Sequence, residues 1–144
     1  MARIDRQRLD SAVFPVTSPI QTRFDDVDVQ GHVNNAAAAV ILQEARVAMN
    51  RTAGFSEVKE GLRPVVASLR IEYVGEMHYH SPVEVSTGLL SIGRTSVVVA
   101  QRACQDGRPT LYAETVLVMT TSDGPTAIPP SLRSAYEQVL IRAE

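Results

Sequence analysis

The sequence from residue 23 to residue 35 reads Arg23-Phe24-Asp25-Asp26-Val27-Asp28-Val29-Gln30-Gly31-His32-Val33-Asn34-Asn35, and it continues into an alanine-rich segment that ends at Ala53. The stretch places a carboxylate, an amide and an imidazole beside the start of a predicted helix. Burial of polar groups costs free energy, so such clusters are common where a protein carries out chemistry. This stretch is therefore the candidate functional site of the chain.

The alanine-rich segment predicts a helix over residues 34–53. Asparagine is a favoured N-cap residue, and Gly54 follows where a left-handed residue is expected to end the helix. Apolar side chains surround the first two turns instead of forming a single stripe, which is typical of a helix buried on all sides. The sequence therefore predicts a central helix that is wrapped by a sheet.

Strands are predicted before and after this helix. A short strand at residues 20–24 leads into the site. In residues 65–74 apolar and polar side chains alternate with a period of two. The predicted apolar face of that strand consists of Val65, Ala67, Leu69, Ile71 and Tyr73.

Three further strands are predicted at residues 83–92, 96–103 and 110–121, with a hairpin at Asp106-Gly107 between the last two. After a linker at residues 122–130, apolar residues from Leu132 to Ala143 recur at helical spacing and predict a short C-terminal helix. The fold class is therefore α+β, with a curved, mostly antiparallel sheet around one helix.

The composition favours one domain over residues 1–144, with its core at about residues 18–122, since a chain of this length buries about 68–70% of its unfolded surface. The formal net charge of -2 argues against a nucleic-acid partner, which would require a basic surface. No apolar run predicts a signal peptide or a membrane span. Because Cys104 is the single cysteine, we expect a reduced, cytoplasmic protein without a structural metal.

Asp28 is the strongest candidate for a catalytic group. The positive end of the helix dipole favours its ionised form, which can attack a carbonyl carbon or activate a water. Gln30 can orient that water, and His32 can hydrogen-bond Asp28, steer the water or polarise the carbonyl. The spacing alone also permits structural roles, with Asp28 as an N-cap or Asx-turn residue and His32 as a turn residue whose hydrogen bonds are satisfied.

The helix start offers a second chemical group, because its first backbone N–H groups have no acceptor within the helix and can stabilise an oxyanion. These donors run from about Gly31 to Asn35 and include the N–H groups of Gly31, Val33 and Asn34. Together with a nearby carboxylate they suit acyl transfer. Asp25 and Asp26 are expected to be turn residues in contact with solvent.

The pattern from Arg23 to Asn35, followed by Glu44-Ala45-Arg46 on the helix, resembles the signature of hotdog-fold thioesterases of the 4-hydroxybenzoyl-CoA thioesterase type. It is also similar to plant acyl-ACP thioesterases. The resemblance implies a hotdog fold and hydrolysis of an acyl-CoA thioester without a cofactor. By this resemblance, Asp28 would be the catalytic carboxylate, and Gln30 and His32 would assist it. Gln30 stands where those relatives have an asparagine.

The same resemblance implies where the substrate binds and how the chain assembles. It implies a homodimer, or a further assembled tetramer, with the active site between subunits. The residues expected to line the substrate channel and contact CoA fall in two segments, Arg63-Pro64-Val65 and Arg94-Thr95-Ser96.

Several neighbouring residues carry weaker expectations. Small side chains at Ala36–Ala39 favour a wide acyl pocket, which a phenylalanine at Ala38 or Ala39 would shorten. Glu44 is expected to be a buried partner of Arg46, His32 or the backbone, outside the catalytic set. His78 and His80 are expected in solvent.

Two other functions fit the same fold. Acyl-ACP hydrolysis would use the same chemistry on a protein carrier, whereas a non-catalytic hotdog protein would bind acyl-CoA as a sensor. A hotdog hydratase is less favoured, because the chain lacks the Asp-x-Asn-Pro-x-His pattern that such enzymes resemble.

Overall fold

The structure, a computed structural model, describes residues 3–55 and 61–144. Its main sheet is antiparallel with the strand order β2-β4-β5-β6-β3, and β7 pairs with the end of β6. The sheet comprises β2 (Val16–Ile20), β3 (Arg63–Tyr73), β4 (Val83–Ile92), β5 (Ser96–Gln105), β6 (Arg108–Thr121) and β7 (Gly124–Pro125). The remaining elements are α1 (Arg6–Ser11), β1 (Ala12–Val13), α2 (Asn35–Thr52), α3 (Pro130–Glu137) and β8 (Arg142–Ala143).

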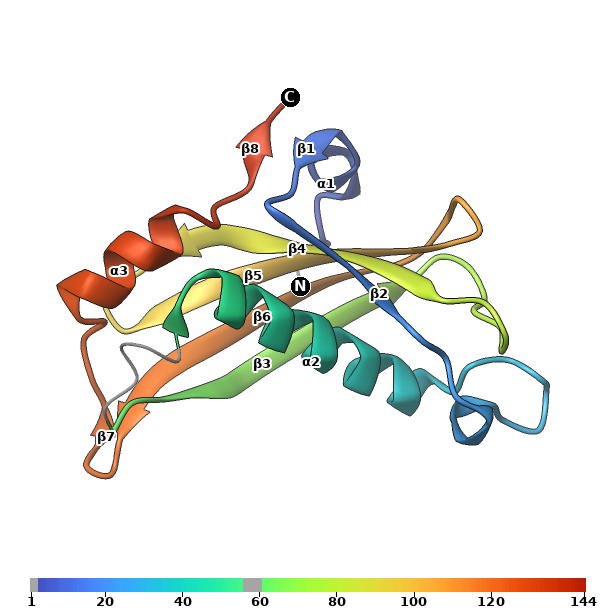
Figure 1. The fold of residues 1–144 in the computed structure, drawn as a ribbon, viewed down its shortest axis with the longest axis horizontal. Helices are drawn as coiled ribbons and strands as arrows, with labels where there is room; N and C mark the ends of the chain where they lie inside the picture. The colour runs from blue at the N-terminus through green and yellow to red at the C-terminus, as the bar shows by residue number, and fades with distance from the viewer. Residues whose placement is uncertain (1–2, 56–60) are drawn as a thin grey trace.

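The long helix α2 lies across the concave face of the sheet, as Figure 1 shows. The helix bounds agree with the prediction: the Asn34 side chain caps the helix by accepting from the N–H of Ala36, and Gly54 has a φ of +74°. Burial on all sides was wrong, however. One face of α2 packs on the sheet, whereas Val40 and Val47 on the other face are 45% and 43% exposed.

Two apolar clusters fill the space between α2 and the sheet. One includes Leu42 near the middle of the helix, and the other includes Met49 near its end. A polar row separates them on the concave face, made of Thr87 on β4, Gln101 on β5 and Thr115 on β6, all fully buried. Such a row is satisfied only if its members bond one another or the helix above them.

The edge strand β3 departs from simple alternation. A β-bulge lies between Val66 and Ser68, because Val66 pairs with Leu117 whereas Ser68 pairs with Val116. A bulge inserts one residue and so moves the following side chains to the other face. The predicted apolar face is therefore correct from Leu69 to Tyr73 and wrong at Val65 and Ala67, with Val66 facing the helix instead.

The two ends of the predicted fold also differ from the structure. The first strand is Val16–Ile20, not residues 20–24, and Pro19 is tolerated there because β2 is an edge strand. The C-terminal helix ends at Glu137 because the chain then pairs with β4. The N–H of Leu89 donates to Val139, and the N–H of Ile141 donates back to Leu89.

Both terminal segments cover the outer face of the sheet. Ile4 and Leu9 are buried against Ala100 and Tyr112, and β1 pairs with β8. Asp10 joins the segment to the sheet, since it accepts hydrogen bonds at 2.8 Å from Arg102 and at 2.5 Å from the hydroxyl of Tyr112. With α2 on the concave face and the terminal segments on the outer face, β3 is the strand that keeps large exposed side chains, with Val65 and Val66 48% and 47% exposed.

In residues 3–55 and 61–144, no helix combines the length and the apolar character needed to span a membrane.

Candidate active site

Asp28 sits in a tight loop between the Phe24–Asp26 turn and α2. One oxygen of its carboxylate, Oδ1, accepts the backbone N–H groups of Gln30 at 2.9 Å and His32 at 3.3 Å. The loop is closed by main-chain bonds from Gly31 to Asp28 and from Asp28 to His32, and Gly31 has a φ of +83°, which favours glycine. Among the described residues nothing bonds the other oxygen, Oδ2. The backbone thus fixes the carboxylate and leaves one oxygen available.

The helix start uses most of its N–H groups internally. The N–H of Gly31 donates to Asp28, that of Val33 to Met77 and that of Asn34 to Asp26. These three donors, which the sequence assigned to an oxyanion hole, are therefore already engaged. Within the described part of the chain, the N–H of Asn35, the first residue of α2, has no acceptor.

The His32 side chain turns away from the Asp28 carboxylate. Its Nε2 lies 3.0 Å from an oxygen of Glu76, and its ring lies 5.3 Å from that of His78. The Asp28 carboxylate is therefore hydrogen-bonded by the His32 backbone N–H and not by the imidazole. Gln30 is exposed, and its N–H is the part that contacts Asp28.

Asp26 differs from its expected exposure. It is only 4% exposed, and it accepts the Arg23 N–H and the Arg23 guanidinium, each at 2.9 Å. Burial disfavours the Asp26 anion, but the hydrogen bonds from Arg23 outweigh it and hold the pKa of the carboxyl below its usual value. Asp26 thus anchors the loop, while Asp25 is exposed as predicted.

Tyr73 is a site residue that the sequence did not reveal. Its hydroxyl donates to the carbonyl of Asn35 at 2.8 Å and so ties the end of β3 to the start of α2. Burial raises the pKa of the Tyr73 phenol, which keeps it a donor at neutral pH. The alternation placed Tyr73 on the correct face of its strand, but no local pattern identifies a partner 38 residues away.

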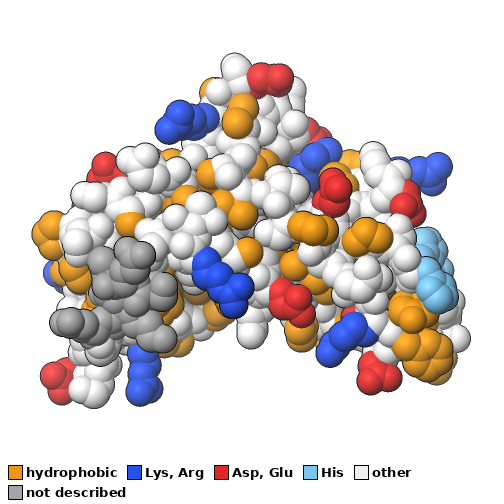
Figure 2. All heavy atoms as spheres, viewed as in Figure 1, with side chains coloured by type: hydrophobic (Ala, Val, Ile, Leu, Met, Phe, Trp, Pro, Cys, Tyr) orange, Lys and Arg blue, Asp and Glu red, His pale blue; other side chains and the backbone are white. Residues whose placement is uncertain are grey.

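The mouth of the site is apolar. Phe24 and Val29 are 76% and 104% exposed, and the Phe24 ring packs edge-on against Tyr79 at 6.0 Å. Figure 2 shows hydrophobic side chains beside histidine at this end of the molecule. An open cavity of about 500 Å³ adjoins it, with Glu76 and Arg108 in its lining. His78 and His80 are exposed, as predicted.

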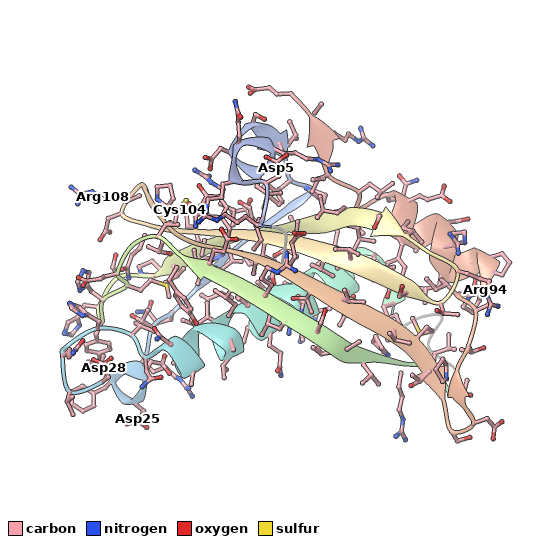
Figure 3. All side chains as sticks on the ribbon, turned by 180° about the vertical axis from the view of Figure 1, so that it is seen from behind. Asp5, Asp25, Asp28, Arg94, Cys104 and Arg108 are labelled. Carbon is pink, nitrogen blue, oxygen red and sulfur yellow. The ribbon has the colours of Figure 1, made fainter. Side chains whose placement is uncertain are left out.

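The segment predicted to line the substrate channel and the segment predicted to contact CoA both lie at the other end of the sheet. Figure 3 shows Asp28 and Arg94 at opposite ends of the molecule. Arg94, Thr95 and Ser96 form the turn between β4 and β5, and Arg63-Pro64-Val65 begins β3, whereas Tyr73 at the end of β3 contacts α2 beside the site. One copy of the chain therefore does not bring these segments to Asp28.

A known family model covers most of the chain, including the loop and the helix α2. The model of the thioesterase-like superfamily matches residues 22–136. The chain belongs to this superfamily. It is 27% identical over 126 residues to the acyl-CoA thioester hydrolase YbgC of Escherichia coli, which covers 83% of this chain and 94% of that protein.

Solved thioesterase structures share the fold. A thioesterase from Thermus thermophilus, complexed with coenzyme A and Zn, matches with a TM-score of 0.78 and 25% identity over 88% of this chain and 95% of that chain. A predicted thioesterase from Bacillus stearothermophilus matches with a TM-score of 0.79 and 26% identity over 86% and 95%. The predicted hotdog fold and the predicted thioesterase class are confirmed.

Glu44 and Arg46, the helix part of the signature, do not pair as expected. Glu44 is exposed, whereas Arg46 is 6% exposed and bonds Gln101 at 3.3 Å and Thr115 at 3.4 Å. The exclusion of Glu44 from the catalytic set stays a prediction.

Proposed function

We propose that this chain hydrolyses acyl-CoA thioesters with Asp28 as the catalytic carboxylate. The observation that carries the proposal is the Asp28 geometry: two backbone N–H groups hold Oδ1, and Oδ2 is left without a partner among the described residues. The activity named for YbgC and the coenzyme A in the Thermus thermophilus structure support the choice of substrate class.

Asp28 then acts in one of two ways. As a general base, it takes a proton from a water, whose oxygen attacks the thioester carbonyl carbon. As a nucleophile, it attacks that carbon itself and forms a mixed anhydride that water then cleaves. In either route the C–S bond breaks, and CoA leaves as a thiolate that takes up a proton.

The developing oxyanion needs a donor at the helix start. Because Gly31, Val33 and Asn34 already donate within the protein, we assign this role to the N–H of Asn35. The Tyr73 hydroxyl bonds the carbonyl of the same residue and so fixes its peptide groups. A donor of this kind typically contributes about 10²- to 10³-fold to kcat.

A homodimer would complete the site. If the β3 edges of two copies pair antiparallel, Arg63-Pro64-Val65 of the second copy lies beside Tyr73 of the first, and the Arg94-Thr95-Ser96 turn approaches from the same side. The exposed side chains of Val65 and Val66 on β3, 48% and 47% exposed, support such a contact. A basic segment near the catalytic carboxylate would suit the phosphates of CoA.

The test follows free thiol release from an acyl-CoA panel. We expect Asp28→Asn to reduce kcat at least about 100-fold. Asp25→Asn, which changes an exposed carboxylate of the same loop, serves as the matched control and should remain active. Light scattering should show a dimer for all three proteins. Equal activity of Asp28→Asn and the wild type would refute the role of Asp28.

The panel also separates the other functions. Release from acyl-ACP but from no acyl-CoA would favour the carrier-protein thioesterase. Tight binding of acyl-CoA without release from either substrate would favour the sensor.

A further inference from the structure

The face of α2 that points away from the sheet carries a shallow hollow. Its volume is about 230 Å³, and the side chains that line it are Gln43, Glu44, Val47, Ala48 and Arg51. The centre of this hollow is apolar, and Val47 there is 43% exposed. Figure 2 looks onto this side of the molecule and shows basic and acidic side chains on the surface over α2.

The spacing of the lining residues is that of a socket for another helix. Glu44, Val47, Ala48 and Arg51 are residues i, i+3, i+4 and i+7 of α2. In packed helix pairs, four residues with this spacing form the hole that receives one side chain of the facing helix. Because the middle of the hole is made by a valine and an alanine, an aliphatic side chain suits it.

The two charged residues of the hole have no partners of their own. Glu44 and Arg51 are exposed, and within residues 3–55 and 61–144 neither side chain forms an ion pair or a hydrogen bond. They carry opposite charges at the two ends of the hole. A second α2 that runs in the opposite direction therefore places its Arg51 beside Glu44 and its Glu44 beside Arg51. The surface is complementary to a second copy of itself, as a two-fold contact requires.

The other parts of the fold leave this face free for such a contact. The terminal segments cover the outer face of the sheet, where Ile4 and Leu9 are buried against Ala100 and Tyr112. In the dimer proposed above, antiparallel pairing of the β3 edges gives one continuous sheet with both copies of α2 on the same side. Two such dimers that face each other make the α2 contact twice, and the repetition strengthens a contact that is small by itself.

We propose that the outward face of α2 is a self-association surface, through which two dimers stack helix to helix into a reversible tetramer. Each α2 lies antiparallel to an α2 of the other dimer, with the two-fold axis between Val47 and Ala48. Val47 of each copy inserts into the hole of the other, and two ion pairs between Glu44 and Arg51 close its ends. Because exposed ion pairs and a small apolar seam associate weakly, the dimer prevails at the low protein concentration of an activity assay.

Sedimentation equilibrium over a range of protein concentrations tests the proposal. We expect the wild type to contain two chains when dilute and four when concentrated. Glu44→Arg and Arg51→Glu should each weaken tetramer formation about 10-fold or more, because each brings like charges together at all four pairs of the tetramer. Glu137→Arg, which reverses an exposed carboxylate on α3, is the matched control and should associate as the wild type does.

Restoring the opposite charges tests the antiparallel register. The double variant Glu44→Arg/Arg51→Glu again has opposite charges at every pair and should regain the association of the wild type. An equimolar mixture of the two single variants should also form tetramers, since the dimers of one variant complement those of the other. Circular dichroism melting at low concentration should be unchanged in all variants, because both positions are exposed.

The outcomes separate this contact from the dimer and from the chemistry at Asp28. A wild type that stays at two chains at every concentration would refute the proposal. Single variants that associate as tightly as the wild type would refute it as well, and so would a double variant that does not recover. If the wild type instead passes from one chain to two and the single variants block that step, the α2 contact stands and the β3 dimer fails. Loss of thiol release in Asp28→Asn leaves all of these masses unchanged.

Discussion

Gly88 controls whether the terminal segments stay on the outer face of the sheet. A Cβ atom at this position of β4 would lie 2.6 Å from Cγ2 of Ile141 and 2.7 Å from Cδ of Pro15. Contacts this short force a displacement, and the proline ring cannot rotate away. Gly88→Val therefore pushes on the C-terminal and N-terminal segments at the same time.

The size of the effect follows from what holds the segments down. Extra carbon atoms in a packed region typically cost about 1–3 kcal/mol. Detachment exposes Ile4 and Leu9, each worth about 1.5–3 kcal/mol, but the ordering of more than ten residues at about 1–2 kcal/mol each opposes the attachment. The net free energy of attachment is therefore a small difference between a large burial term and a large entropy term. A strain of about 1–3 kcal/mol then raises the detached population about 5- to 150-fold.

Limited trypsin digestion measures that population, because Arg6, Arg8 and Arg142 lie in the two segments and cleavage of a transiently open state tracks its abundance. Cleavage of Gly88→Val should speed up accordingly, while thiol release stays unchanged because the segments cover the face opposite α2. Ser91→Val, at an exposed position of the same strand, is the control. Cleavage of Gly88→Val at the wild-type rate would refute the argument. So would a hydrogen-exchange experiment in which the amides of α2 lose as much protection as those of the terminal segments.

Two other substitutions test the site and its loop. Ala39→Phe should shorten the preferred acyl chain with the fold intact, because Ala39 is half-buried and borders the uncovered side of β3. Ala38 is fully buried, so a phenylalanine there should unfold the chain. If Ala39→Phe leaves the preference for acyl chain length unchanged, the predicted acyl pocket is wrong. Asp26→Asn should lower the urea midpoint at about pH 6 but much less at about pH 3. Because the pKa of Asp26 is depressed in the folded state, the ionised carboxylate stabilises the fold above the unfolded-state pKa of about 3.9, and this stabilisation is lost as the pH falls through the folded-state pKa. A difference in urea midpoint between Asp26→Asn and the wild type that did not change with pH would argue against the Arg23 contact.

Local patterns predicted the parts of the fold that local physics determines. The cap at Asn34, the glycine at 54 and the Asp106-Gly107 turn each depend on a few adjacent residues, and all three form as expected. The turn around Asp28 could be predicted for the same reason, since it is built from bonds to residues within four positions, whereas the catalytic role of Asp28 stays a prediction. The bulge at Ala67 could not be identified, because it depends on the register with β6.

Contacts between distant segments account for the rest. The partner of Tyr73 is on α2, that of His32 is Glu76 on the loop after β3, and those of Arg46 are on β5 and β6. The sequence provides no rule for such pairs. The N-terminal segment shows the same limit: six residues of α1 are too few for a stable isolated helix, and the helix exists because Leu9 packs on the sheet.

The geometry of β3 connects the proposed assembly with the proposed chemistry. Its eleven residues span about 33 Å, so Arg63 and Tyr73 stand at opposite ends of one protomer. Antiparallel pairing of two such edges exchanges those ends, which would bring the basic segment of each copy to the carboxylate of the other. The same pairing would cover backbone groups and valine side chains that are exposed in one copy. A charge reversal at Arg63 should therefore weaken CoA binding in a mixed dimer only at the Asp28 site of the unmodified copy, and equal weakening at both sites would rule out a site shared across the β3 edge.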